Sequence, residues 1–275
     1  MGKYQVSRAF KLYLTLAAGL LIPASSMAVS IQVPSMGIKT ISEAMMRTRG
    51  GDTVWVDEGV YREHVLIAPG VTLISRSTFK AVIDGGGRGT CVTMGKNTTI
   101  SGFEVRNGTI GIFSNGAGNT ISSCRIVKNW QTGIITVRQL PKIEDNIIAF
   151  NRGSGIQGWD VRSTNATINH NSIAFNGNHG IAVGGSSEFI LENNLITNNE
   201  RFGLKILSDA ERIQVTNNNF YKNLNIPGKP LPSGNFSFDP AFTSPRMGMN
   251  FKPDPAHCCK AKGTDNEELG ARITY

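Results

Sequence analysis

From Thr99 onward, the sequence repeats with a period of about 22–25 residues. Six successive segments align as TISGFEV, TISSCRI, KIEDNII, TINHNSI, LENNLI and VTNNNF. Each has an aliphatic residue near its start and another apolar residue five positions later, and a glycine-aliphatic pair follows in the first five repeats, from Gly111-Ile112 to Gly203-Leu204. Alternate side chains of a strand point to the same side. The repeat therefore predicts three short strands per turn of the chain.

Asparagine recurs at two corners of the repeat. An asparagine side chain tolerates the left-handed backbone conformation that a sharp bend needs, so we expect each first-row asparagine to adopt it. We also expect the amides to stack in columns and to hydrogen-bond along the axis. The first row is Asn146, Asn171, Asn194 and Asn218, and the second is Asn129, Asn151, Asn176, Asn199 and Asn223.

These features predict an all-β fold, a single-stranded right-handed parallel β-helix of about 22–25 residues per coil. Coils stacked about 4.8 Å apart turn the aliphatic rows into one core. A helical solenoid would show a 3.6-residue apolar period, and a sandwich would not keep one polar residue at one corner. We assign residues 1–28 to a signal peptide, 29–235 to the β-helix with its cap, and 236–275 to an irregular tail packing on the helix.

The N-terminus has the pattern of an export signal. Lys3, Arg8 and Lys11 accompany the apolar stretch LYLTLAAGLLIP, and small residues precede a predicted cleavage after Ala28. The alternative, a membrane anchor, would need roughly twenty apolar residues, so we expect a secreted or periplasmic protein with no membrane span after signal removal. Removing three of the 28 basic residues, against 20 acidic ones, leaves a mature net charge of +5 rather than +8. This charge suits an acidic polysaccharide as partner. Because the sequence has no clustered stripe of Lys and Arg, we expect no nucleic-acid partner. We also expect a monomer.

The four cysteines leave the disulfide pattern open. They are Cys91, Cys124, Cys258 and Cys259. Export permits disulfides, but a bridge between the two adjacent cysteines would be strained, so any bridge runs from one of them to a distant partner. Their spacing makes no zinc motif, and His64 has no histidine nearby, so no metal site is predicted.

Several further segments resemble the pectin-lyase-like superfamily of right-handed β-helix repeat proteins. GIKTISEAMMRTRGGDTVWVDEGVYREHVLI, residues 37–67, is similar to the opening of that class, which implies a short N-terminal helix that caps the barrel. GVTLIS and VIDGGG continue the first coils. FDPAFTSP and LGARITY resemble its ending. The resemblance spans nearly the whole mature chain and implies the fold, with ligands bound on the outer face of the sheet that carries the glycine-aliphatic pairs. It does not by itself specify a function.

On that face, the residues after the inward aliphatic ones point outward: Phe113, Ile135, Gln157, Ala182 and Lys205. Trp159 offers a flat apolar plate for a sugar ring, and Ala182 and Gly184 leave open floor beside it. The predicted substrate-binding residues are Gln157, Trp159, Arg138 and His179, and the predicted catalytic residues are Lys205, Arg162 and Asp160. The alternative is that Trp159 packs under a loop and the charges are simply solvated. His170, beside the Asn171 corner, is expected to cap a turn.

The chemistry of this face suggests two functions. A polysaccharide lyase must neutralise a uronate carboxylate and remove a ring proton, for which Lys205 or Arg162 could be the base. Calcium gains little support, because only Asp160 and Asp209 are near and they are about 10 Å apart. The carboxylate pair of a glycoside hydrolase is absent from the sequence of this face, and so is an intact pectin methylesterase motif. We predict an exported protein that acts on or binds an acidic polysaccharide, with no cofactor. The alternative is a non-catalytic scaffold or accessory protein that binds glycan or a protein partner, or a purely structural envelope component.

Overall fold

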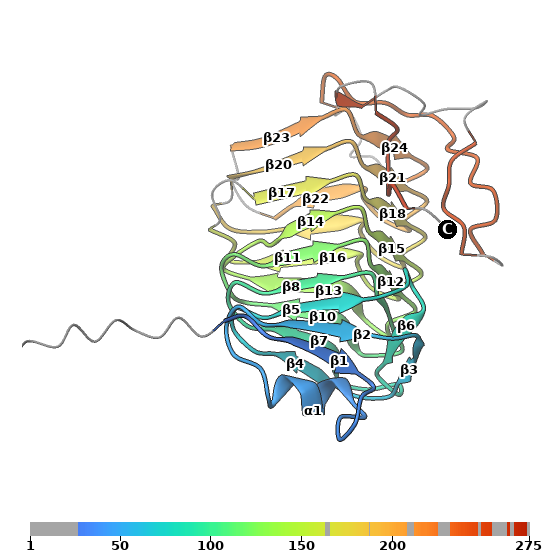
Figure 1. Cartoon of the computed structure of the whole chain (residues 1–275). Helices are drawn as coiled ribbons and strands as arrows, with labels where there is room; N and C mark the ends of the chain where they lie inside the picture. The colour runs from blue at the N-terminus through green and yellow to red at the C-terminus, as the bar shows by residue number, and fades with distance from the viewer. Residues whose placement is uncertain are drawn as a thin grey trace, which may run out of the picture.

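The computed structural model describes residues 27–162, 166–186, 188–207, 212–224, 232–246, 249–254, 263–264 and 267–273. Most of the predicted signal peptide, Asp209, Cys258 and Cys259 lie outside these residues. Within them the chain is an all-β, right-handed parallel solenoid, as predicted, with three strands per coil and strand pairs that are parallel throughout the sheets (Figure 1). No helix among the described residues is long and apolar enough to cross a bilayer.

The strands form three sheets, each running along the axis. Sheet 1 contains β1 (Ser30–Val33), β2 (Thr53–Val56), β5 (Thr72–Ser75), β8 (Thr99–Ser101), β11 (Thr120–Ser122), β14 (Lys142–Glu144), β17 (Ala166–Asn169), β20 (Glu188–Glu192) and β23 (Arg212–Thr216). Sheet 2 contains β3 (Gly59–Tyr61), β6 (Ala81–Asp84), β9 (Glu104–Arg106), β12 (Arg125–Val127), β15 (Ile147–Ala149), β18 (Ser172–Ala174), β21 (Leu195–Thr197) and β24 (Asn219–Tyr221). Sheet 3 contains β4 (Val65–Ile67), β7 (Thr90–Met94), β10 (Ile110–Ser114), β13 (Thr132–Val137), β16 (Ile156–Trp159), β19 (Ile181–Val183) and β22 (Leu204–Ile206).

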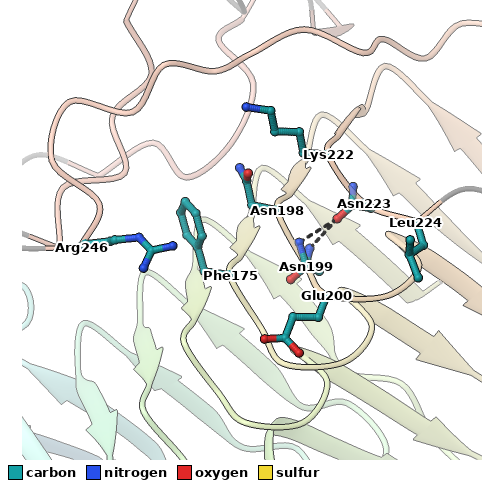
Figure 2. Close-up of a pocket in the computed structure, with 8 residues that line it drawn as sticks. All are labelled: Phe175, Asn198, Asn199, Glu200, Lys222, Asn223, Leu224 and Arg246. Carbon is teal, nitrogen blue, oxygen red and sulfur yellow. Dashed lines mark hydrogen bonds between the residues drawn. The ribbon is translucent and has the colours of Figure 1, made fainter.

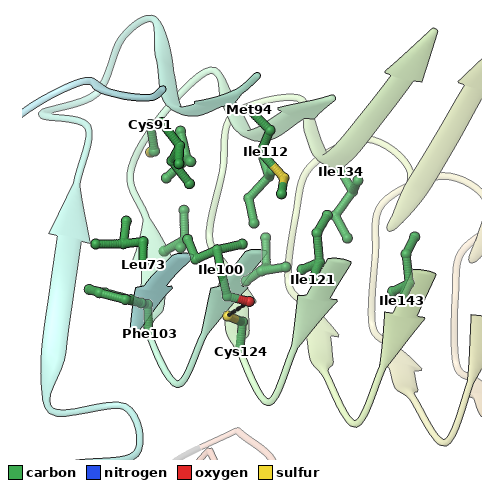
Figure 3. Packing of buried hydrophobic residues seen from close by; sticks show 14 of the residues in the cluster. Leu73, Cys91, Met94, Ile100, Phe103, Ile112, Ile121, Cys124, Ile134 and Ile143 are labelled. Carbon is green, nitrogen blue, oxygen red and sulfur yellow. Dashed lines mark hydrogen bonds between the residues drawn. The ribbon is translucent and has the colours of Figure 1, made fainter. Parts of the chain in front are cut away.

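The core consists of aliphatic columns that follow the strand register. In sheet 1, Ile100 pairs with Ile121 and Ile121 with Ile143. Ile112 and Ile134 of sheet 3 pair with each other and point into the same interior (Figure 3). All five side chains are fully buried. The column predicted from the repeat is therefore present, and each coil supplies part of a core that it could not form alone.

A short helix covers the first coil. Helix α1 (Ile41–Met45) buries Ile41 and Ala44 against the open end of the barrel (Figure 1). Thr40 and Glu43 form a capping box, and the Glu63 carboxylate accepts from the backbone N–H groups of Ile41 (2.9 Å) and Ser42 (2.8 Å). The helix shields apolar side chains that the stack would otherwise expose, as the sequence predicted.

The first asparagine row forms a buried hydrogen-bonded column. Asn171 donates to the Asn194 side-chain oxygen from both its backbone N–H (2.9 Å) and its Nδ2 (3.0 Å), and Nδ2 also donates to the Ile143 carbonyl (2.8 Å). The pattern repeats along the row and continues past Asn218 to Asn235. Each amide satisfies backbone groups of neighbouring coils, which a buried corner requires.

One expectation about these corners is wrong. The left-handed residue is not the column asparagine but the residue before it, at Asp145, His170, Asn193 and Asn217, with φ between 51° and 57°. The bend at that residue lets the following side chain turn inward, where its amide reaches the next coil. The column position therefore demands an inward amide, and the preceding position demands tolerance of positive φ.

The C-terminal segment lies outside the barrel against sheet 2 (Figure 1). Phe242 and Phe251 pack against Phe150 and Phe175, whose rings stack with centroids 5.3 Å apart. Residues 267–273, here called the C-terminal strap, cross several coils. The Ala271 N–H donates to Ser172 Oγ (3.1 Å). One coil away, the Arg272 guanidinium donates to the Asp145 carboxylate from its Nε (2.8 Å) and its Nη2 (3.0 Å).

Removing one column amide should destabilise the whole barrel. Asn194→Ala leaves the backbone N–H and Nδ2 of Asn171 without their acceptor in a buried corner. We expect the free energy of unfolding to fall by about 2–4 kcal/mol, measured by urea denaturation. Asn115→Ala, at an exposed position, is the matched control and should change it by less than about 0.5 kcal/mol. Equal effects of both changes would contradict the structural role of the column.

The strap makes stability depend on pH through His170. This side chain is 2% exposed, and its Nε2 lies 3.2 Å from the Glu267 carboxylate. Burial, helped by Arg272, lowers the pKa of His170 below its usual 6.5, although Asp145 and Glu267 oppose the shift. The folded state thus binds a proton less readily than the unfolded state. The contribution of His170 to the free energy of unfolding is therefore fully present above about pH 6.5. It is lost as the pH falls from there through the lowered pKa of the folded state.

His170→Asn tests this dependence, because asparagine occupies the same corner at Asn193 and Asn217. We expect the wild type to lose more thermal stability than the variant between about pH 7.5 and 5, since only the wild type carries the imidazole. Parallel melting-temperature profiles for the two proteins would show that His170 does not titrate as described.

Candidate functional site

The outer face of sheet 3 presents the predicted outward residues in one column. The register pairs Phe113 with Ile135, Ile135 with Gln157, Gln157 with Ala182, and Ala182 with Lys205. Successive members are therefore about 4.8 Å apart, and Lys205 lies two coils, or roughly 10 Å, from Gln157. The face is a regular array in which side chains far apart in sequence become neighbours along the axis.

Trp159 ends β16 and is half exposed. Its backbone carbonyl accepts from the N–H of Arg138 in the preceding coil (3.0 Å). In the next coil the position that corresponds to Trp159 is Gly184, which directly follows β19 and carries no side chain. The tryptophan is therefore not covered by a loop among the described residues, and it remains available as an apolar plate.

The turn after Trp159 brings Asp160 and Arg162 together. Val161 points into the core and is fully buried, so the residues on either side of it project outward. The Arg162 guanidinium donates to both Asp160 oxygens, with Nε–Oδ1 and Nη2–Oδ2 distances of 3.1 Å. Gly185, whose φ is 114°, lies against the Val161 backbone. A Cβ at position 185 would lie 2.4 Å from the Val161 carbonyl oxygen. The sequence placed both charged residues on this face but did not predict that they neutralise each other.

His179 and Lys205 lie around a different ring. The His179 ring stacks on Phe202 with centroids 5.5 Å apart, and its Nδ1 accepts the Phe202 N–H (3.2 Å). Lys205 Nζ lies 5.0 Å from the same Phe202 ring. Burial, and then the charges of Arg201 and Lys205, lower the pKa of His179. Because Nδ1 accepts the Phe202 N–H, the proton of the neutral imidazole lies on Nε2.

The predicted site residues thus form two groups rather than one centre. Trp159, Asp160, Arg162 and the backbone of Arg138 meet at the end of β16, whereas His179 and Lys205 meet at Phe202. Gln157 lies between them and accepts from Thr132 Oγ1 of the preceding coil (3.3 Å).

Sequence reasoning missed the role of Phe202. It precedes Gly203 just as His179 precedes Gly180, so the repeat register already places the two rings one above the other.

The described thiols have the environment of core residues. Cys91 and Cys124 are buried without a disulfide among the described residues, and burial raises the pKa of each thiol to about 12. Within the same part of the chain, no three His, Cys, Asp or Glu side chains gather as metal ligands would. Metal binding by cysteine requires the thiolate, which these two sites disfavour.

Residues 48–229 match the family model described as "Periplasmic copper-binding protein (NosD)". This match covers well over half of the 275 residues. The chain belongs to the NosD family. No curated protein sequence matches the chain.

Solved structures with a similar fold include polysaccharide lyases. A mannuronic acid specific family 6 lyase from human gut microbiota is 16% identical with a TM-score of 0.54, over 70% of this chain and 54% of that one. The family 6 alginate lyase AlyGC is 16% identical with a TM-score of 0.53, over 70% of this chain and 32% of that one. Pectate lyase Pel9A is 14% identical with a TM-score of 0.56, over 91% and 97%. The chain thus spans about half and about a third of the lengths of the first two, and at such identities the likeness shows the fold alone.

Thiol reactivity should follow burial. In a Cys258→Ser, Cys259→Ser variant, we expect Cys91 and Cys124 to resist iodoacetamide in the folded protein, because their thiols stay protonated and covered. In urea both should react at the rate of a free cysteine, as followed by mass spectrometry. Rapid labelling of the folded variant would contradict their placement in the core.

Proposed function

We propose that this NosD-family chain is an exported, periplasmic binding protein that holds an acidic polysaccharide along the outer face of sheet 3, without cleaving it. The observation that carries the proposal is the half-exposed Trp159 at the end of β16, with Gly184 in the next coil and the Asp160–Arg162 pair in the turn that follows. Lys205 adds a cation on the same face, two coils along the axis.

The shape and charge of the face support an extended anionic ligand. A parallel sheet that runs along the axis places one outward position after another, coil by coil, so a polymer can contact several coils in succession. An aromatic plate packs against the apolar side of a sugar ring, and cations offset the charge of uronate carboxylates. The family description supports the periplasm, and the names of the similar lyases support uronate polymers as the class to test.

A binding role fits the contacts better than a lyase reaction. The Arg162 guanidinium is already held by Asp160, and the Nδ1 of His179 already accepts a backbone N–H. Lys205 lies about two coils from Gln157, so no residue of the predicted catalytic set is both free and close to Trp159. Removal of a ring proton would need such a base within hydrogen-bond reach.

Copper, which the family description names, does not fit the described barrel. Copper favours imidazole, thioether and thiolate ligands. Among the described residues, Cys91 and Cys124 are protonated core thiols, His170 Nε2 and His179 Nδ1 are engaged in the contacts given above, and no three His, Cys, Asp or Glu side chains gather as metal ligands would. The proposed binding face is built from residues of sheet 3 and does not depend on a metal.

Calorimetric titration with oligomannuronate, oligoguluronate and oligogalacturonate tests the proposal. Trp159→Ala should weaken binding at this face about tenfold, because it removes the stacking surface. Trp55→Ala, on the outer face of sheet 1 beside Arg76, is the matched control and should leave affinity unchanged. Equal affinities of the wild type and Trp159→Ala for every oligomer would remove the proposed face.

The same samples separate binding from cleavage. We expect no rise in the absorbance of unsaturated products when the wild type is incubated with alginate or pectate. A rise that Lys205→Gln abolishes would favour the lyase reaction over the proposed binding role.

A further inference from the structure

A second cleft lies where the coils turn from sheet 2 into sheet 3, near the C-terminal end of the barrel (Figure 2). It has a volume of about 540 Å³ and is open to solvent. The barrel forms most of its lining, and the C-terminal segment contributes Arg246. Its floor is the end of the second asparagine column, where Asn199 Nδ2 donates to Asn223 Oδ1 (2.9 Å). The cleft therefore rests on a rigid part of the fold.

Two rows of side chains form the walls that the barrel contributes. Phe175, Asn198 and Lys222 are the left-handed corner residues of three successive coils, with φ of 55°, 54° and 49°, so they project outward in one column. Glu200 and Leu224 each follow an asparagine of the floor and form the second row. Gly177 precedes them in this row, where a Cβ would lie 2.4 Å from the Arg152 carbonyl oxygen. The row thus lacks a side chain beside Glu200, which widens the cleft.

The cleft carries two cations, Arg246 beside Phe175 and Lys222 at the other end of the corner column, and one carboxylate, Glu200. Arg246 Cζ lies 5.4 Å from the Phe175 ring, and within the described part of the chain its guanidinium forms no ion pair. Lys222 Nζ is 4.0 Å from the Asp239 carboxylate, an exposed pair that contributes little. Figure 2 shows Lys222 and Glu200 on opposite sides of Asn198 and Asn199. Leu224, which is 57% exposed, adds an apolar surface.

From this arrangement we propose that the cleft is a second saccharide site, which binds a single carboxylate-bearing sugar unit. The carboxylate accepts charge-assisted hydrogen bonds from Arg246 and Lys222. Ring hydroxyls donate to Glu200 and accept from the Asn198 amide, and the apolar side of the ring contacts Leu224. The choice of a saccharide rests on the proposed function, whereas the cleft does not overlap the face around Trp159.

Two other anionic ligands match the cleft less well. An acidic peptide would bring further negative charge toward Glu200 and offers no hydroxyl donors in return. A free amino acid could pair with both signs of charge, but small molecules are generally held in enclosed pockets that bury most of their surface, and this cleft is open. An open cleft suits one unit of a longer chain.

Calorimetry on the full chain with a trigalacturonate tests this site in a Trp159→Ala background, which removes stacking at the sheet 3 face. We expect Arg246→Gln and Lys222→Gln each to weaken the remaining binding about tenfold. Arg152→Gln is the matched control: this cation stacks on Trp130 outside the cleft, 3.8 Å from the ring, and its loss should change affinity less than about twofold. The methyl-esterified trisaccharide should bind at least tenfold more weakly than the acid.

The second site would be overturned if the Trp159→Ala parent did not bind the trigalacturonate at all. An unchanged affinity in Arg246→Gln, with an unchanged melting temperature, would also overturn it. So would triglutamate or free glutamate binding as tightly as the trigalacturonate. Failure of the sheet 3 face gives a different result. In that case Trp159→Ala alone leaves affinity and stoichiometry unchanged, and only the cleft variants lose binding.

Discussion

The structure depends on the asparagine amides that connect one coil to the next. A single amide has one acceptor oxygen and two N–H donors, which is enough to satisfy backbone and side-chain groups of the adjacent coils at a buried corner. In the first column the Asn171 side chain contacts the coil below through Ile143 and the coil above through Asn194. Because an unsatisfied buried donor is costly, each asparagine fixes the register of its neighbours.

The register in turn determines which outward side chains become neighbours on the surface. Once the coils are aligned, every outward position becomes part of a column with a spacing of about 4.8 Å. The column through Gln157, Ala182 and Lys205 depends on Gly155, Gly180 and Gly203, which precede these residues by two positions. A Cβ at any of these glycines would clash with the backbone, a ring or an amide of the next coil. The corner column through Phe175, Asn198 and Lys222 has the same origin. A flat face and an open corner cleft both follow from one repeated geometry.

The sequence was sufficient for those features that the repeat carries. The aliphatic columns, both asparagine columns and the outward column of sheet 3 could be predicted because each depends on spacing alone. The capping helix followed instead from the resemblance of residues 37–67 to a known class. The left-handed corner residue could not be predicted, since His170, Asp145 and Asn193 share a backbone conformation but no side-chain chemistry. Contacts that cross the repeat were also beyond prediction: the Asp160–Arg162 pair depends on Val161 turning inward, and Arg272 reaches Asp145 across 127 residues of sequence.

Hydrogen exchange at the column corners tests the central claim most directly, namely that buried amides hold the coils in register. The backbone N–H groups of Asn146, Asn171 and Asn194 each donate to the next asparagine side chain. They should exchange as slowly as the N–H groups of the core strands, with the free energy of global unfolding. Exchange at these three positions as fast as at the exposed Asn115 would show that the corners open independently and would contradict the account.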